Sequence, residues 1–258
     1  MRMKARAALV ASLAPVLLIG AVGCTTAGGS ATGRSPDPKG PATTPAAPGS
    51  TGAPGSTGTP GTSATPRTGS ALEKGALEQG DLVGYQISAQ GKNPNAPDGQ
   101  PRADKKACQP LADVMGDKPD PAARETVNRG VGSQTQLGLA ISASVSSYAE
   151  NDAKQLMTRL KAAVAACGAG FNATVQKQTG SYREVKAADY RTGADDSVSW
   201  TVVAAAQGVS AHVHLVLVRQ GSTIVRLMAL NVADAQRKGD VPHDLTDKQI
   251  QKIKQNIR

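Results

Sequence analysis

Two histidines on one predicted strand are the best-spaced metal ligands in this sequence. In His212-Val213-His214, both imidazoles share one face of an extended strand, because successive side chains alternate. A catalytic zinc site takes three protein ligands, and the one other histidine, His243, lies beyond the strand near a predicted helix start. The intervening apolar residues form the opposite face. We therefore expect His212 and His214 to face solvent, with no bound metal or other cofactor.

No recognisable catalytic motif accompanies these histidines. The sequence lacks a Gly-x-Ser-x-Gly elbow, a His-Glu-x-x-His motif, a Walker loop and a complete Gly-x-Gly-x-x-Gly motif. Asp113, Asp117 and Asp120 have the wrong spacing for a calcium loop. Asp195 and Asp196 are adjacent in a predicted turn, which favours a solvated corner. We therefore predict no catalytic residues and no enzyme activity.

A cysteine at the end of an apolar segment indicates a different chemistry. Three basic residues, Arg2, Lys4 and Arg6, precede an uncharged run over 7–23, which is the pattern of a secretory signal. Small residues stand directly before Cys24, and this sequence resembles the lipobox of bacterial lipoproteins. The resemblance implies that residues 1–23 are removed. It also implies that Cys24 becomes the lipid-carrying amino terminus, held on the outer face of the cytoplasmic membrane.

Two alternatives to lipid attachment remain open. An uncleaved transmembrane anchor would have to use seventeen apolar residues interrupted by Pro15 and Gly20, which is the short end of the spanning range. Ordinary signal cleavage would release a protein with Cys24 as an unpaired thiol, which secreted chains seldom keep.

The segment from Cys24 to residue 70 has the composition of a disordered linker. After Cys24, all of its residues except Arg34, Asp37, Lys39 and Arg67 are Ala, Gly, Pro, Ser or Thr. Such a segment cannot bury enough apolar surface to fold. A flexible chain of this length has a root-mean-square reach of roughly 35 to 40 Å. We expect it to hold a single folded domain, residues 71–258, away from the membrane.

The two cysteines of the folded domain are expected to form a disulfide. Exported domains meet oxidising conditions, and Cys108 and Cys167 allow one pairing. A catalytic thiol or a metal site would need suitable partners, and no Cys-x-x-Cys motif or Cys/His cluster lies near either residue. The disulfide is therefore the favoured interpretation.

Charge and aromatic content bound the classes of partner. The chain carries a net charge of +9, of which residues 71–258 carry +4, without the clustered Lys/Arg stripe typical of nucleic-acid binding. The six aromatic residues are too few for stacking platforms, and Trp200 is expected in the core. We predict no nucleic-acid partner. The expected partners are the membrane, through the lipid, and a component of the cell wall or another protein.

The hydrophobic pattern of the domain predicts mainly strands joined by glycine turns. Turns at Gln207-Gly208 and Gln220-Gly221-Ser222 indicate an antiparallel meander. Strands are expected at 82–89, 126–131, 136–147, 171–176, 182–187, 197–206, 209–219 and 223–231. Helices are expected at 72–77, at 107–115, at 151–167 with Asn151 or Asp152 as cap, and from a capping box at Thr246 and Gln249.

These elements predict an α+β fold: a curved antiparallel sheet with helices packed on one face and one disulfide. Cys108, the helix end Ala165-Ala166-Cys167-Gly168 and the strand Ser199-Trp200-Thr201-Val202 resemble actinobacterial surface lipoproteins related to the extracellular sensor domains of mycobacterial receptor kinases. Those sensor domains carry two disulfides, whereas this domain has cysteines for one.

The leading functional hypothesis is a non-catalytic ligand-binding or sensing domain on the cell surface. One alternative is an envelope lipid carrier, which requires a large apolar cavity between the sheet and its helices. The other is a cell-wall enzyme, in which His212, His214 and a carboxylate would converge.

Overall fold

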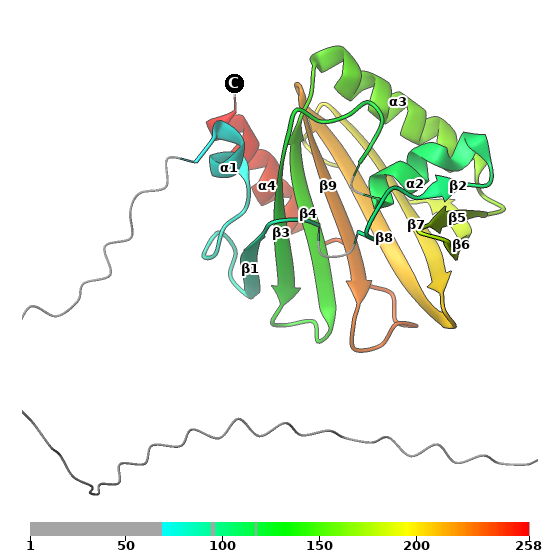
Figure 1. Ribbon diagram of the computed structural model, residues 1–258. Helices are drawn as coiled ribbons and strands as arrows, with labels where there is room; N and C mark the ends of the chain where they lie inside the picture. The colour runs from blue at the N-terminus through cyan, green and yellow to red at the C-terminus, as the bar shows by residue number, and fades with distance from the viewer. Residues whose placement is uncertain (1–68, 94–95, 117, 258) are drawn as a thin grey trace, which may run out of the picture. The chain divides into compact units, whose positions relative to one another are not determined.

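A computed structural model describes residues 69–93, 96–116 and 118–257 (Figure 1). In this part of the chain, nine strands form one open antiparallel sheet in the order β1-β3-β4-β9-β8-β7-β6-β5-β2. The strands are β1 (Tyr85–Gln90), β2 (Arg102–Ala103), β3 (Glu125–Ser133), β4 (Leu139–Ser147), β5 (Phe171–Val175), β6 (Gln178–Ala187), β7 (Asp196–Ala206), β8 (Val209–Gln220) and β9 (Thr223–Asn231). The predicted class, α+β with a curved antiparallel sheet, is confirmed.

Tight turns join β7, β8 and β9, as the glycine pattern predicts. Gln207 and Gly208 have φ angles of +51° and +80°. Two successive positive φ angles are typical of the type I′ turn, whose backbone twist matches the twist of the two strands that it joins. Gly221 has a φ of +59° in the turn between β8 and β9. The meander of these strands is therefore confirmed.

The helices lie on both faces of the sheet, which differs from the expected single layer. They are α1 (Ala71–Gly75), α2 (Gln109–Met115), α3 (Glu150–Ala166) and α4 (His243–Asn256). In Figure 1, α2 and α3 lie together as one pair, and α1 and α4 lie together as a second pair apart from the first. Along β8, Leu215 and Leu217 join the core under α2 and α3, whereas Val216 and Val218 join the core under α1 and α4. Both faces of this central strand are apolar, so both need a cover.

Two predicted helix starts are wrong. The third helix begins at Glu150 after Ala149, so Asn151 and Asp152 lie inside its first turn. The last helix begins at His243, which places the proposed capping box inside the helix. The Thr246 hydroxyl lies 2.8 Å from the Tyr190 hydroxyl. Gln249 accepts from the backbone N–H of Leu77 and donates to the carbonyl of Gly75. Both polar residues therefore bind distant segments.

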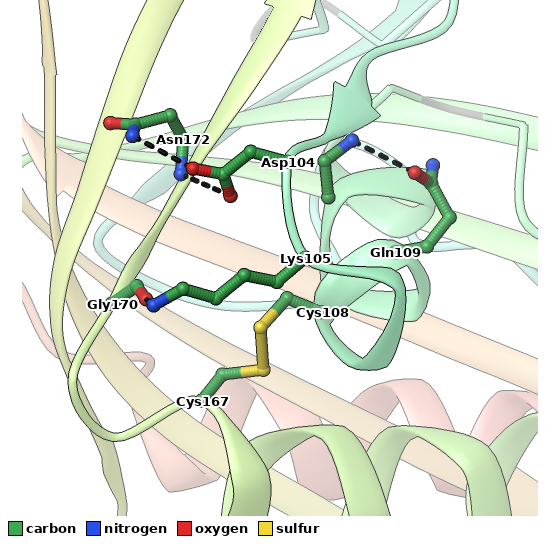
Figure 2. The surroundings of a disulfide bond; sticks show 8 residues. Asp104, Lys105, Cys108, Gln109, Cys167, Gly170 and Asn172 are labelled. Atoms are coloured by element: carbon green, nitrogen blue, oxygen red, sulfur yellow. Dashed lines mark hydrogen bonds between the residues drawn. A yellow bond between two sulfur atoms is a disulfide. The ribbon is translucent and has the colours of Figure 1, made fainter.

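The predicted disulfide between Cys108 and Cys167 is confirmed and joins the start of α2 to the end of α3 (Figure 2). Polar contacts fix the segments around it. Lys105 donates to the carbonyl of Gly170 at 2.6 Å, and Asp104 accepts from the backbone and the side chain of Asn172. The bridge therefore holds α2, α3 and the start of β5 together over the core around Trp200, which is buried as predicted.

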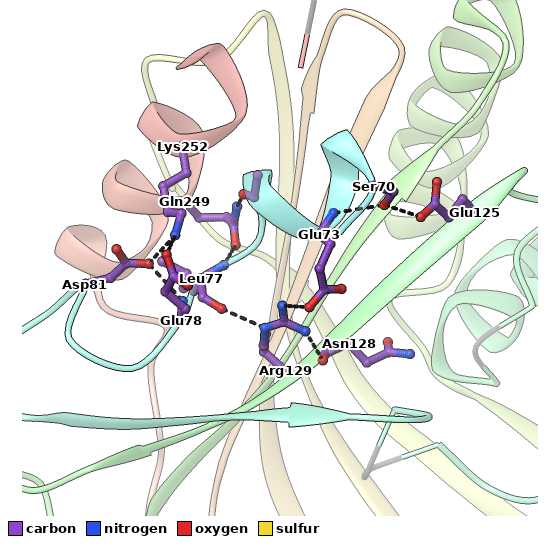
Figure 3. A network of polar contacts seen from close by, with 11 residues as sticks. Ser70, Glu73, Leu77, Glu78, Asp81, Glu125, Asn128, Arg129, Gln249 and Lys252 are labelled. Atoms are coloured by element: carbon purple, nitrogen blue, oxygen red, sulfur yellow. Dashed lines mark hydrogen bonds and ion pairs between the residues drawn. The ribbon is translucent and has the colours of Figure 1, made fainter. Parts of the chain in front are cut away.

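A polar network attaches α1 to the sheet and to α4 (Figure 3). The Arg129 guanidinium is buried, donates to the carbonyls of Leu77 and Asn128, and pairs with the Glu73 carboxylate. On α4, Lys252 pairs with carboxylates of the segment that follows α1, at 2.9 Å and 2.8 Å. The first described residues of the chain are thus held to the domain by hydrogen bonds as well as by apolar packing.

The predicted signal segment 1–23, the lipid site Cys24 and nearly all of the predicted linker lie outside the described residues. Within 69–93, 96–116 and 118–257, no helix has both the length and the apolar character needed to span a membrane.

Candidate functional site

Both histidines of β8 were expected to face solvent, but only His212 is partly exposed. His214 is 6% exposed, whereas His212 is partly exposed. The backbone N–H of Val241 donates to Nδ1 of His214 at 3.1 Å. The ring of Tyr190 lies edge-on to the imidazole of His214 and stacks on that of His243, with centroids 4.1 Å apart in the stack. The start of α4 and the segment before it therefore cover this face of β8.

Ser199, His214 and Asp240 have the spacing of a hydrolytic triad. Ser199 Oγ lies 2.8 Å from His214 Nε2, and Asp240 Oδ1 lies 3.4 Å from Nδ1. In a working triad, Nδ1–H donates to the carboxylate and Nε2 accepts the serine proton. Here Nδ1 accepts from Val241, so the proton of the neutral ring sits on Nε2 and points at Ser199 Oγ. The serine hydroxyl in turn donates to the carbonyl of Leu215. This tautomer cannot activate Ser199.

The protonation states of the cluster agree with a structural role. Burial lowers the pKa of His214; Asp240 opposes the shift, and His243 adds to it. Burial also raises the pKa of Tyr190 to about 12. The Tyr190 hydroxyl donates to the carbonyl of Pro242 at 3.1 Å. His214 and Tyr190 are therefore neutral near pH 7, and their hydrogen bonds fasten the start of α4 to the sheet.

The described residues bring no three His, Cys, Asp or Glu side chains together in an arrangement that could hold a metal ion. A cavity beside His212 and His214 is lined by Lys186, Lys238 and Asp240 and measures about 80 Å³. Pockets for small molecules usually measure about 300 to 1,000 Å³. This cavity is too small for such a ligand.

A larger recess lies on the sheet face that α2 and α3 leave open, over β1, β3 and β4. It measures about 570 Å³. We call it the uncharged groove, because no charged or aromatic side chain is among its lining residues. These are Gln79, Gln86, Ile87, Ser88, Gln90, Gly130, Val131, Gly132, Gln134, Ala140 and Ile141. The groove is therefore suited to uncharged polar groups of a ligand.

Small residues of β3 make room for this groove. Gly130 pairs with Ser88, and Gly132 pairs with Gln86. A Cβ atom added to Gly132 would meet no atom within 4 Å, so the space above this residue is open. The side-chain amides of Gln86 and Gln134 make no hydrogen bond within the described residues. Their donors and acceptors are thus available to a ligand.

An unpaired hydroxyl lies on the same sheet face, one strand further in. Ser142 pairs with Gly130 across β3 and β4 and is 1% exposed. Within the described residues, its Oγ has no hydrogen-bond partner. A buried polar atom without a partner costs free energy, and an ordered water or a ligand group commonly satisfies it. This face therefore has unused hydrogen-bonding capacity.

The groove was not predicted from the sequence, although part of its signal is local. In β4, Ala140, Ser142 and Ser144 alternate with apolar residues, so small and polar side chains share one face, although Ser142 and Ser144 are buried there. Gln86, Ser88 and Gln90 show the same alternation in β1. What the sequence lacks is a local signal that β1 pairs with β3, about 40 residues away, and so brings the two polar faces together.

Comparison with known proteins finds weak structural similarities. The sequence matches no protein-family model, and no curated protein is similar to it. The fold is similar to the extracellular domain of PknH from Mycobacterium tuberculosis, with 9% identity, a TM-score of 0.44, and coverage of 72% of this chain and 94% of that one. It is also similar to the Rv0999 ortholog from Mycobacterium smegmatis, with 9% identity, a TM-score of 0.37, and coverage of 67% and 90%. At these TM-scores we draw no functional conclusion from either similarity.

Proposed function

We propose that this protein is a membrane-anchored surface lipoprotein whose folded domain binds a ligand through uncharged polar groups and does not catalyse a reaction. The observation that carries the binding role is the uncharged groove, whose lining offers free amide groups and space above Gly132. The lipid on Cys24 supplies the anchor on the outer face of the cytoplasmic membrane. The ligand comes from the cell wall or from another protein.

The geometry of the histidine cluster supports a non-catalytic role. His214 directs its Nε2 proton at Ser199, and Nδ1 is occupied by the N–H of Val241. Neither nitrogen of this ring is then free to act as a general base or as a metal ligand. The enzyme hypothesis therefore has no supporting site among the described residues.

The lipid-carrier hypothesis is not favoured by the packing between α3 and the sheet around Trp200, which is closed. Trp200, Met157 and Leu160 fill the layer between α3 and the sheet and are at most 1% exposed. The cavity that lies in this layer beside Arg226 measures about 20 Å³. That volume holds a water molecule but no acyl chain.

Native mass spectrometry of the protein purified from its own host tests the binding role. Gly132→Trp places an indole in the groove without backbone strain, because Gly132 has an ordinary φ and open space around it. Gly193→Trp is the matched control, since Gly193 is also unobstructed but lies in the loop before β7. We expect a copurifying molecule in the parent protein and in the control, and its loss in Gly132→Trp. Equal retention of that molecule in both variants, or no bound molecule in the parent, would contradict the proposal.

A further inference from the structure

Strand β1 is an edge of the sheet and directs backbone groups away from its neighbour. It pairs with β3 in continuous register from Tyr85 to Gln90. In an antiparallel strand, the N–H and C=O groups of alternate residues point to opposite sides. The outward groups belong to Tyr85 and Ile87, because these two residues bond a side chain outside the sheet. By the same alternation, the N–H and C=O of Ala89 also point outward.

The side chain of Gln79 occupies part of this edge. Its Oε1 accepts from the N–H of Ile87 at 2.8 Å, and its Nε2 donates to the C=O of Tyr85 at 3.4 Å. A primary amide thus presents the acceptor and the donor that the backbone of an added strand would present. Gln79 is itself exposed, so a competing backbone can displace it. Within the described residues, Ala89 makes no backbone hydrogen bond outside the sheet.

The edge lacks the features that usually prevent strand addition. Proteins protect such edges with lysine, proline, bulges or a covering element. The sequence of β1 is Tyr-Gln-Ile-Ser-Ala-Gln, without charge or proline, and its pairing with β3 has no bulge. Ser88 and Ala89 are exposed. The single amide of Gln79 is therefore the cover of this edge in the described part of the chain.

We propose that the outer edge of β1 binds an extended peptide segment of a partner protein as a tenth strand, which displaces the amide of Gln79. This inference rests on the proposed function and names the ligand class of the uncharged groove. Side chains of an added strand alternate between the two sheet faces. On one face they lie beside Gln86 and Ser88 in the groove.

On the other face, the added side chains lie beside an ion-rich cleft. This cleft is lined by Ala89 together with charged groups of α1, α4 and the segment between α1 and β1, among them Glu78 and Lys252. The complementary peptide therefore alternates uncharged polar residues with charged ones and lacks proline.

Two other occupants fit these faces less well. A second copy of β1 would place Ile87 and Ala89, which are apolar, beside the charged cleft. The linker of this chain carries a proline every few residues, and proline cannot donate to a strand ladder. A partner segment that alternates uncharged polar residues with charged residues fits both faces.

A displayed library of random ten-residue peptides, selected on the exported protein purified from its host, provides the probe. The best peptide is then made with N-methyl groups on its odd-numbered or its even-numbered residues. Strand addition uses every second N–H, so we expect one methylated series to lose binding at least about tenfold and the other to bind nearly normally. Gln79→Ala removes the competing amide and should raise affinity about fivefold.

Ala89→Pro removes an outward N–H without breaking the ladder to β3, and it should abolish peptide binding. Ala122→Pro, in an exposed loop before β3, is the control and should bind as the parent does. The unfolding transition of each variant verifies that it is folded.

Equal effects of both methylated series, unchanged affinity in Gln79→Ala, or no enriched peptide would overturn the inference. A ligand lost in Gly132→Trp but kept in Ala89→Pro would overturn strand addition and leave the proposed function standing. Self-association that Ala89→Pro abolishes would identify a second copy as the occupant instead.

Discussion

Ser199 Oγ and His214 Nε2 lie 2.8 Å apart, yet the proton between them belongs to the histidine. The N–H of Val241 donates to the other ring nitrogen, and the Ser199 hydroxyl donates onward to the carbonyl of Leu215. This series of hydrogen bonds runs in the direction opposite to that in a catalytic triad, where the serine donates to the histidine. Distances alone would have suggested a hydrolase, whereas the backbone donor decides the tautomer.

Protonation of His214 should destabilise the fold at pH values below 6.5, the ordinary pKa of a histidine side chain. Burial holds the pKa of the folded ring below the ordinary value of 6.5, so the unfolded chain binds more protons in the interval between the two values. Stability from the neutral ring is complete above pH 6.5 and falls as the pH decreases toward the folded pKa. We expect the free energy of unfolding in urea to decrease between pH 7 and pH 5. This decrease should be smaller in His214→Gln and unchanged in His212→Gln. An identical pH dependence in all three proteins would contradict the assignment.

Loss of Arg129 should loosen the start of the domain. The carbonyl of Leu77 is buried and depends on Arg129 Nε, so Arg129→Ala leaves it without its donor. We expect a loss of about 2 kcal/mol in the free energy of unfolding. Glu73→Gln keeps a hydrogen-bond acceptor beside the guanidinium and removes a half-exposed charge, so it should cost less than about 1 kcal/mol. Urea unfolding measures both values. Equal small costs would show that the network contributes little.

Removal of the disulfide should lower stability without changing the fold. The bridge closes a loop with a sequence separation of 59 residues. The chain-entropy model gives about 4 kcal/mol for a loop of this size, as an upper expectation. The double variant Cys108→Ala and Cys167→Ala, compared with the oxidised parent by urea unfolding, should show a decrease of this order. An unchanged midpoint would mean that the bridge does not constrain the unfolded chain.

The proposed lipid anchor depends on Cys24. Diacylation gives stable membrane attachment, whereas one acyl chain gives marginal attachment. Cys24→Ala should therefore move the folded domain from the membrane fraction to the soluble fraction after cell fractionation. Membrane retention of a shortened Cys24→Ala product would refute this anchor.

The sequence predicted the elements of this fold better than their packing. The turn at Gln207-Gly208 is a local signal, and it was interpreted correctly. The run from Leu215 to Val218 has no alternation, which is the signature of a strand covered on both faces. It was nevertheless assigned one apolar face, and the second helix layer was missed for that reason.

The remaining errors come from partners distant in sequence. Thr246 and Gln249 have the spacing of a capping box, but Tyr190 and Leu77 bind them from 56 and 172 residues away. His214 looked solvent-facing because nothing local indicates that Val241 returns to cover it. The groove likewise needs the pairing of β1 with β3, which no local pattern specifies.

Hydrogen exchange, with and without the ligand that copurifies from the host, tests the binding site most directly. Protection should concentrate at residues 86–90 and 130–134, which contain most of the lining of the uncharged groove. The pattern should persist in Gly193→Trp and disappear in Gly132→Trp. Protection centred on His212, His214 and residues 238–240, with none in β1 and β3, would place the functional site at the histidine cluster and contradict this account.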